Sequence, residues 1–526
     1  MLRRRIAAPP DRVLDAAAGR IACGFADPTA AQVSGDTIVW SSVPDVAEEV
    51  ERRAVVAPDG DGTTLTMQAR YTIDIPYFGR FFGPLVRRAV NRSLSHMADV
   101  LEARATGRSE PPPPRRPVWI TRDRLTARQA STIAAIAATL VVAGYGGGLF
   151  TQTLHFVAKS FRARDASLGV ALAVTRVGAL VGIAGSALAD RRGRRRIMLV
   201  SMAGVCAASV ATAFAPNLAV FTTLQVFVRG FVQLASVVGF IAITEEAPEG
   251  SRAFLLAVAG MAAGAGFALG AALLPIADLA SWAWRTMFAA AGLGLLVLPG
   301  LARRLTETGR YVAIADRAAG ARAGELVDPI YGGRFVLVAA VVFLLGFFGT
   351  PSLQFTNQYL QDERGFSALG IFWLRGVTQG FPALAAIVAG GRLAESHGRK
   401  PVAARATFVL AFATAGFFLW SGVAVWVTLF IGTIAGAMSG PAITAFNTEL
   451  FPTEVRGRAA AALLAAGVAG SVTGLLFVGY LADPLGGVGR ALAVTCVVPV
   501  VVAVFVIPRL PEGRGRALDE LSPPEV

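Results

Sequence analysis

The sequence predicts an all-α membrane protein of twelve transmembrane helices, arranged as two six-helix repeats and preceded by a small α+β soluble domain. Of the 526 residues, 54% are hydrophobic and only 16% are charged, whereas about a quarter of a soluble protein is charged. From residue 131 onward, apolar segments long enough to cross a bilayer follow one another. A loop pattern also returns 205 residues further along the chain, which indicates an internal duplication.

The α+β domain is expected at residues 1–105, which differ in composition from the rest of the chain. A strand is expected first, then a short helix opened by Pro9 and Pro10. Alternating apolar and polar residues predict an antiparallel sheet, with a hairpin turn at 58–62. Apolar residues at helical spacing predict a long final helix over 77–104. The expected strands are 2–8, 37–42, 49–57 and 63–74.

This order of elements resembles a shortened START-like domain of the polyketide cyclase/dehydrase type (SRPBCC), which has a helix-grip fold. The resemblance implies that the sheet and the long helix enclose a hydrophobic ligand. A small folded cap without a ligand fits the same pattern, so both interpretations stay open.

A linker rich in proline and arginine is expected at 106–130, because consecutive prolines stiffen and extend a chain. The two six-helix halves are expected at 131–300 and 334–507. A central cytoplasmic loop, 301–333, joins them, and a cytoplasmic tail, 508–526, follows. The predicted spans are 131–156, 167–187, 197–214, 218–241, 254–274, 283–300, 334–358, 369–390, 402–421, 424–446, 459–481 and 488–507.

The basic residues concentrate in one set of connections between the spans. Because short basic loops stay on the cytoplasmic side, we expect a multi-pass protein of the plasma (inner) membrane with its N-terminal domain and C-terminal tail in the cytoplasm. The N-terminus has no apolar core of signal-peptide length. Membrane orientation accounts for the net charge of +14, so no nucleic-acid partner is expected.

Catalysis is not expected either. The sequence shows no nucleotide-binding loop, no metal-ligand cluster and no paired nucleophile and base. The three cysteines are scattered, and two of them lie inside predicted spans. We therefore expect no enzyme activity, no cofactor and no metal.

Two short loops carry the clearest motif. Residues 186–196 read SALADRRGRRR and residues 391–400 read GRLAESHGRK, so a leucine, an alanine, a carboxylate, a glycine and a basic pair recur at one spacing. Other residues repeat at the same or nearly the same offset, among them Arg285 and Arg490. Two unrelated basic loops would not keep one register over six helices, so we interpret the chain as a duplication.

The doubled loop resembles the signature of the major facilitator superfamily. Residues 449–457 (ELFPTEVRG) and 511–520 (PEGRGRALDE) resemble its sugar and general-substrate porter branch. The resemblance covers residues 130–520. It implies a secondary transporter that moves a small organic solute by alternating access. The implied partners are this substrate, the lipid bilayer and a coupling ion, and the implied protein is a monomer.

The sequence departs from the family pattern at three places, and the two that lie in spans leave the substrate open. Ser186 stands where the first loop usually has glycine. The seventh predicted span lacks the paired-glutamine sugar motif. The fifth lacks the Gly-Pro of many drug/proton antiporters.

The resemblance further implies a conformational latch. Asp190 would contact the start of the eleventh span near Arg456 only when the cytoplasmic side is closed, and Glu395 would mirror this near Arg252. A charge at a helix end contributes ~0.3–1 kcal/mol, and up to ~2 when partly buried, which suits a reversible latch. Alternatively, these charges only orient the protein. The predicted latch residues are Asp190, Gly193, Arg194, Arg195, Glu395, Gly398, Arg399, Glu245, Arg252, Glu449 and Arg456.

Polar side chains inside the spans are the candidates for substrate binding, because they are costly there. Arg176 and Arg229 are expected near the midplane, and no Asp or Glu lies well inside a predicted span. Unpaired cations favour an anionic substrate, unless backbone carbonyls satisfy them. The further candidates are Gln225 and Gln233 on the face of Arg229, Arg375 and Gln379 in the eighth span, and Gln152, Asn357 and Gln358 around an outer vestibule.

Three functions therefore remain: a transporter of a small organic solute such as an organic anion, an exporter of lipophilic compounds, and a transporter-like receptor. Matched latch residues in both halves favour transport, because a receptor does not need two gates. His155 is the candidate for proton coupling, because its imidazole titrates near neutral pH.

Overall fold

The structure is a computed structural model of the chain. It describes residues 2–17, 21, 31–42, 50–71, 79–114, 125–248, 252–305, 329–449 and 453–510. The chain divides into two compact units. One holds residues 1–139, 239–262 and 300–310, and the other holds residues 140–238, 263–299 and 311–526.

The first unit begins with a five-stranded antiparallel sheet of order β1-β5-β4-β3-β2. The predicted hairpin is confirmed, since Val50 pairs with Tyr71 and Asp59 with Gly62 around a turn in which Gly60 has a φ of 63°. The short strand β2 was not predicted; it pairs with β3 across a tight turn at Gly35. The strands are β1 Leu2–Ile6, β2 Gln32–Ser34, β3 Thr37–Ser42, β4 Val50–Asp59 and β5 Gly62–Tyr71.

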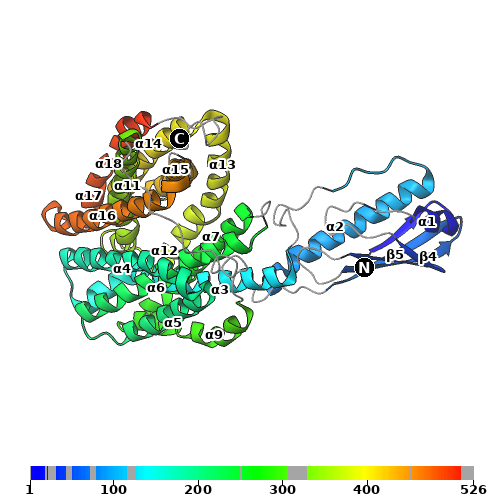
Figure 1. Cartoon of the computed structure of the whole chain (residues 1–526), viewed down its shortest axis with the longest axis horizontal. Helices are drawn as coiled ribbons and strands as arrows, with labels where there is room; N and C mark the ends of the chain where they lie inside the picture. The colour runs from blue at the N-terminus through cyan, green and yellow to red at the C-terminus, as the bar shows by residue number, and fades with distance from the viewer. Residues whose placement is uncertain are drawn as a thin grey trace. The chain divides into compact units, whose positions relative to one another are not determined.

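Two helices complete this domain, α1 Pro10–Ala16 and α2 Gly79–Thr106. Figure 1 shows α2 lying along the sheet. The alternation of β4 and the helical spacing of α2 give each element one apolar side, and these sides meet in a core that is continuous from Ile6 to Ala105. Trp40 lies fully buried at its centre.

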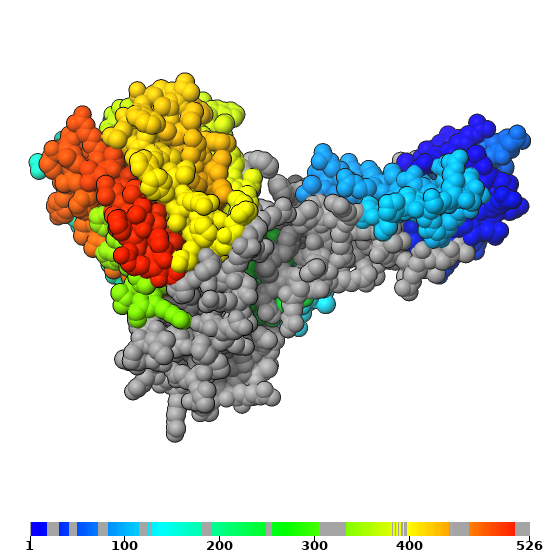
Figure 2. All heavy atoms as spheres, turned by 90° about the horizontal axis from the view of Figure 1, so that it is seen from above, coloured from blue at the N-terminus to red at the C-terminus, as the bar shows by residue number. Residues whose placement is uncertain are grey.

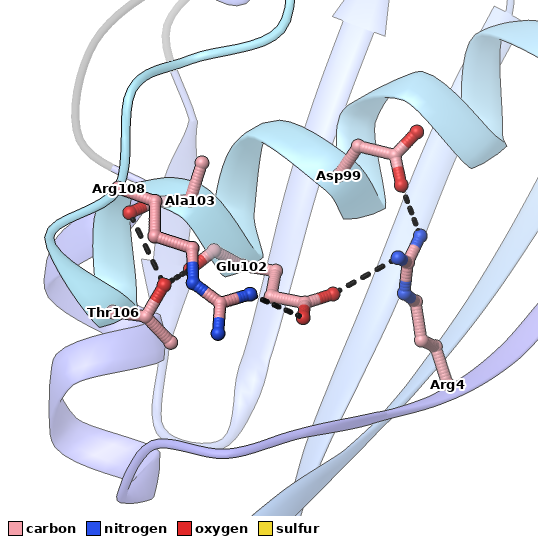
Figure 3. A network of polar contacts seen from close by, with 6 residues as sticks. All are labelled: Arg4, Asp99, Glu102, Ala103, Thr106 and Arg108. Carbon is pink, nitrogen blue, oxygen red and sulfur yellow. Dashed lines mark hydrogen bonds and ion pairs between the residues drawn. The ribbon is translucent and has the colours of Figure 1, made fainter.

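Charged side chains tie the first strand to the long helix (Figure 3). The Arg4 guanidinium pairs with Asp99 and, at 3.0 Å, with Glu102, one turn further along α2. Arg108 lies 3.9 Å from the second oxygen of Glu102, and the Thr106 hydroxyl donates to the Glu102 carbonyl at 2.7 Å. A network of several charges holds an edge strand more firmly than an isolated surface pair does.

The remainder of the described chain is helical. A helix overlaps each of the twelve predicted spans, and several spans are broken into shorter helices. The bounds are α3 Ala127–Phe161, α4 Asp165–Arg192, α5 Arg194–Ala213, α6 Leu218–Glu246, α7 Arg252–Leu273, α8 Trp284–Ala290, α9 Leu293–Arg304, α11 Pro329–Asp362, α12 Ala368–Arg375, α13 Phe381–His397, α14 Arg399–Leu419, α15 Val423–Glu449, α16 Thr453–Leu485, α17 Val488–Thr495 and α18 Val497–Val501. Short 3-10 or π turns fill Leu274–Asp278, Gly376–Gly380, Val502–Val506 and Ile507–Arg509.

Within the described part of the chain, 10 helical segments are long and apolar enough to cross a membrane. The predicted second and eighth spans are not among them. In part of each of these two spans, at 181–191 in α4 and at several positions in α13, the side chains lie outside the described residues. A π-helical turn divides the eighth span into α12, of 8 residues, and α13, of 17. A multi-pass membrane protein is confirmed, and the count of twelve stays a prediction.

Glycines allow helices in both halves to approach closely. A Cβ on Gly266 of α7 would fall 1.9 Å from the Val141 carbonyl oxygen of α3. In the C-terminal half, a Cβ on Gly470 of α16 would fall 2.0 Å from the Phe343 carbonyl oxygen of α11. Small residues commonly permit such packing in membranes, and its occurrence at equivalent places reflects the duplication. The C-terminal helices α14 to α18 pack into one block (Figure 2).

Candidate functional site

A small cavity of about 20 Å³ in this conformation lies among α3, α4 and α6, with one side chain from α11. Both predicted midplane arginines, Arg176 of α4 and Arg229 of α6, line it. No Asp or Glu is among its lining residues. The positive charges of the two arginines therefore have no carboxylate partner within this pocket. The lining is Gly147, Phe150, Thr151, Thr175, Arg176, Gln225, Val228, Arg229 and Gln354.

The partners of these side chains fix part of the pocket wall. Gln225 donates through Nε2 to the Thr212 hydroxyl of α5 at 3.1 Å, which anchors its amide. The Arg229 Nε is buried and has no hydrogen-bond partner among the described residues. A buried charged donor without a partner is costly, so the pocket holds donors available to a ligand. Gln233 lies one turn beyond Arg229 on α6. Its side chain is half-buried and does not line this pocket.

The predicted vestibule residues lie in a buried seam between α3 and α11. Asn357 donates through Nδ2 to the Gln152 side-chain oxygen at 2.8 Å and to its carbonyl oxygen at 3.2 Å. Thr151 donates to Gln354 beside them. Gln152 and Asn357 are both 0% exposed. In this conformation the hydrogen bonds between Gln152 and Asn357 join the two halves. A role for these residues in substrate binding stays a prediction.

Further contacts close the same end of the bundle, which we name the Asp165 end because α4 begins there. Gln358 donates to the Asp165 carboxylate at 2.7 Å, and His155 Nδ1 lies 2.6 Å from Asp362. The Asp278 carboxylate accepts the Ala368 amide at 3.1 Å and so caps α12. Each contact joins one half to the other, so the halves are held together at this end.

The close approach of α4 and α16 adds to this closure. A Cβ on Gly169 would fall 2.8 Å from the Leu475 carbonyl oxygen and 2.9 Å from the Gly479 Cα. Sequence reasoning assigned no role to Gly169, Gly479, Asp165 or Asp362. It identified Asp278 only as part of an Ala-Asp pair that repeats at Asp483, 205 residues further along the chain.

Arg375 and Gln379 do not line the Arg176–Arg229 pocket. They line a separate pocket of about 250 Å³ among α11, α14, α15 and the π-helical turn after α12. The sequence predicted two similar polar pairs, Gln225 with Arg229 and Arg375 with Gln379. The structure shows that each pair lines a different pocket.

The two predicted latch loops share an unusual backbone. Gly193 has φ 88° and ψ 145°, and Gly398 has φ 97° and ψ 152°; each directly precedes the first residue of a helix. Arg194 is buried and Arg195 exposed, whereas Arg399 and Glu245 are half-buried. The side chains of Asp190, Glu395, Arg252, Glu449 and Arg456 lie outside the described residues, so the latch contacts stay predictions.

The N-terminal domain has a wide surface pocket of about 420 Å³ lined by Arg12, Asp15, Ala16, Arg104, Ala105 and Glu110. Arg104 Nε donates to Glu110 at 2.9 Å, and this hydrogen bond holds the pKa of that carboxyl below its usual value. The pocket is therefore charged, unlike the apolar interior that the helix-grip resemblance implies.

Among the described residues, no group of three or more His, Cys, Asp or Glu side chains could hold a metal ion. Cys206 and Cys496 are free and buried.

A family model described as Major Facilitator Superfamily matches residues 135–389 and 373–523, well over half of the chain. The chain belongs to the major facilitator superfamily. This agrees with the doubled loop motif and with the seam between two helical halves. The superfamily and the transporters that resemble the chain in structure indicate a non-enzymatic membrane transporter. No curated protein matches the chain by sequence.

Solved structures of this superfamily resemble the chain in fold. The inward-open xylose transporter XylE from E. coli has a TM-score of 0.63 at 19% identity, covering 75% of this chain and 99% of its own. An inward-facing, unoccupied bacterial homologue of the human lysosomal transporter Spinster scores 0.61 at 17% identity, covering 72% and 96%. The nucleoside transporter NupG scores 0.61 at 11% identity, covering 72% and 99%. At these identities the likeness shows the fold alone.

Proposed function

We propose that this superfamily member is a secondary transporter of a small organic anion, which binds between Arg176 and Arg229. One observation carries the proposal: two arginines face the same small pocket, and no carboxylate lines it. A lone arginine at the centre of a membrane helix costs ~2.5–3.5 kcal/mol on insertion scales. A bound carboxylate or phosphate would supply the missing negative charge.

The other lining residues support a small, partly polar solute. Thr151, Thr175 and Gln225 offer hydroxyl and amide groups, whereas Phe150 and Val228 offer apolar contacts. XylE, by its name a xylose transporter, acts on a neutral sugar. The substrate proposed here differs because two guanidinium groups face a single pocket, where a sugar would leave both charges uncompensated.

Alternating access is supported by the closed Asp165 end. Gln152, His155 and Asp165 each make one polar side-chain contact with the C-terminal half, at 2.6–2.8 Å. Contacts of this size can break when the halves separate. We propose that α4 and the α12–α13 pair also cross the bilayer, which gives twelve spans. We also propose that the Asp165 end faces the exterior of the plasma membrane, with both termini in the cytoplasm.

The role proposed for the N-terminal domain is that of a folded cap. Its sheet and long helix resemble a small START-like domain, but apolar side chains such as Trp40, Leu65 and Met97 fill the described interior between them. A receptor or an exporter that captures lipophilic ligands in this domain would need an open interior, so neither alternative is favoured.

A thermal-shift screen of the purified full-length protein tests the proposed substrate class. Small carboxylates and phosphate esters should raise the Tm in a concentration-dependent way, whereas sugars and uncharged hydrophobic drugs should not. The proposal would be wrong if a neutral sugar stabilised the protein and none of the anions did.

A further inference from the structure

The C-terminal half contains its own buried cation, away from the pocket of Arg176 and Arg229. We propose that the pocket around Arg375 is a second binding site, which takes an amphipathic anion: a carboxylate or sulfonate group on an aromatic or alkyl body. The three following observations support this site independently of which solute the first pocket transports.

Arg375 is the last residue of α12 and is only 7% exposed. Its Nε and Nη2 are buried and have no hydrogen-bond partner among the described residues. The residues lining the pocket include no Asp or Glu. A guanidinium group offers a planar fork of donors that matches a carboxylate, so the free donors of Arg375 define where the negative end of the ligand binds.

The backbone beside Arg375 is also unusual. A π-helical turn, Gly376–Gly380, follows it directly, and Gln379 of this turn lines the same pocket. Isolated π turns inside helices are rare and occur frequently at functional sites. The turn thus brings the neutral side-chain amide of Gln379 to the pocket of Arg375. This amide adds hydrogen-bonding groups without neutralising the positive charge.

The remaining wall is divided between hydroxyl groups and aromatic rings. Several hydroxyls already donate to their own helices: Ser352 to the Phe348 carbonyl oxygen at 2.8 Å and Thr428 to that of Ala424 at 2.6 Å. These two hydroxyls can accept hydrogen bonds but have no donor left, so they do not compete with Arg375 for an anion. Phe348, Phe417 and Phe418 supply apolar surface for the ligand body. The cavity volume of about 250 Å³ lies near the lower end of the range for small-molecule pockets.

The second pocket is distinct from the first. Gln354 of α11 lines the first pocket, whereas Ser352 and Thr356 of the same helix line the second. At about 100° per residue, Gln354 lies on the opposite face of α11 from the mean direction of Ser352 and Thr356. The two cations are therefore reached from different sides of one helix, and variants can separate them.

The test measures binding of 4-phenylbutyrate to the purified full chain by thermal shift and equilibrium dialysis, with the neutral 4-phenylbutyramide as the matched probe. The acid should bind and the amide should not. The control amide also reports partition into detergent. Arg375→Met removes the charge at similar volume and should weaken binding of the acid by about tenfold or more, while the Tm without ligand stays equal or rises. Arg375→Lys should retain part of the binding.

Two further variants keep the test decisive. Gly349 lines the second pocket and has open space where a Cβ would lie. Gly349→Leu should therefore fill the pocket and block the acid even if Arg375→Met fails to fold. Gly260→Leu, also with open space at its Cβ, is the matched control and should bind normally.

Arg229→Gln distinguishes the two sites. It should leave 4-phenylbutyrate binding within about twofold of wild type, although it abolishes binding at the first pocket. The second site is excluded if the amide binds as well as the acid, if Arg375→Met and Gly349→Leu both bind like wild type, or if Arg229→Gln alone abolishes binding. That last result would assign the aryl acid to the transport pocket and leave the proposed function intact.

Discussion

Gly193 and Gly398 determine the shape of two loops that lie 205 residues apart in the sequence. Both have φ near 90° with an extended ψ, a region that is essentially restricted to glycine. Each residue immediately precedes a helix, so the chain reverses between two spans within very few residues. The geometry explains why the repeated motif contains a glycine as well as charges.

Replacing either glycine by alanine should therefore destabilise the protein by about 1–3 kcal/mol. Thermal melting of the purified Gly193→Ala and Gly398→Ala variants measures the effect. The control is Gly260→Ala, at a helical position with open space, which should be neutral or slightly stabilising. Equal melting temperatures for all three variants would contradict this explanation of the loops.

The residues of the two pockets and of the seam between α3 and α11 differ in how much of their environment the sequence could predict. The depth of Arg176 and Arg229 could be predicted, because it follows from position within a span, but their meeting in one pocket depends on how α4 and α6 pack. The missing partners of Arg375 could not be predicted, because they depend on how α11, α14 and α15 pack around it. Gln152 and Asn357 were predicted at equivalent places, but their mutual hydrogen bond depends on the conformational state.

At the scale of elements, the crossing of α4 and α16 is the tightest described contact between the halves at the Asp165 end. Gly169 and Gly479 let the two backbones approach so closely that a Cβ on either would lie within 3.0 Å of the other helix. A larger side chain has no space there unless the helices separate.

Gly169→Leu should therefore favour the state that is open at the Asp165 end. Spin labels on Ser160→Cys and Ser421→Cys, which are exposed positions in the two halves, would report the separation. The variant should shift the distance distribution to longer values, whereas Gly260→Leu should leave it unchanged. An unaltered distribution in Gly169→Leu would show that this crossing does not control the opening.

The helices themselves were largely predictable, because a bilayer requires apolar segments of defined length whatever the tertiary packing. Their interruptions were not. The π-helical turn after Arg375 and the break between α8 and α9 have no distinct hydrophobic pattern. The strand β2 was missed because three residues are too few to show alternation.

On the scale of the whole molecule, the N-terminal domain has a core drawn from residues 6 to 105 alone. Deleting residues 1–105 should leave a protein that still inserts into the membrane, because a domain with its own core folds separately. Size-exclusion chromatography and protease protection in membranes would measure this. Aggregation of the shortened chain would show that the domain is part of the transporter fold.

The latch predicted from the repeated loops acts on the opposite end of the bundle. Asp190→Asn should weaken closure at the Gly193 end and favour the conformation that is open there, so transport falls while expression stays normal. Cysteine accessibility from each side of the membrane would show the shift. Unchanged labelling together with unchanged uptake would exclude the latch.

Counterflow of small carboxylates and phosphate esters in proteoliposomes measures the anion-binding role of Arg229 most directly. Wild type should exchange at least one of these anions, and Arg229→Gln should lose that exchange. Since the variant no longer has a buried unpaired charge, its Tm without ligand should equal or exceed that of wild type. If Arg229→Gln instead unfolds the protein, and no anion is exchanged by or stabilises wild type, then Arg229 is a structural tie between helices and the transported solute is not an anion.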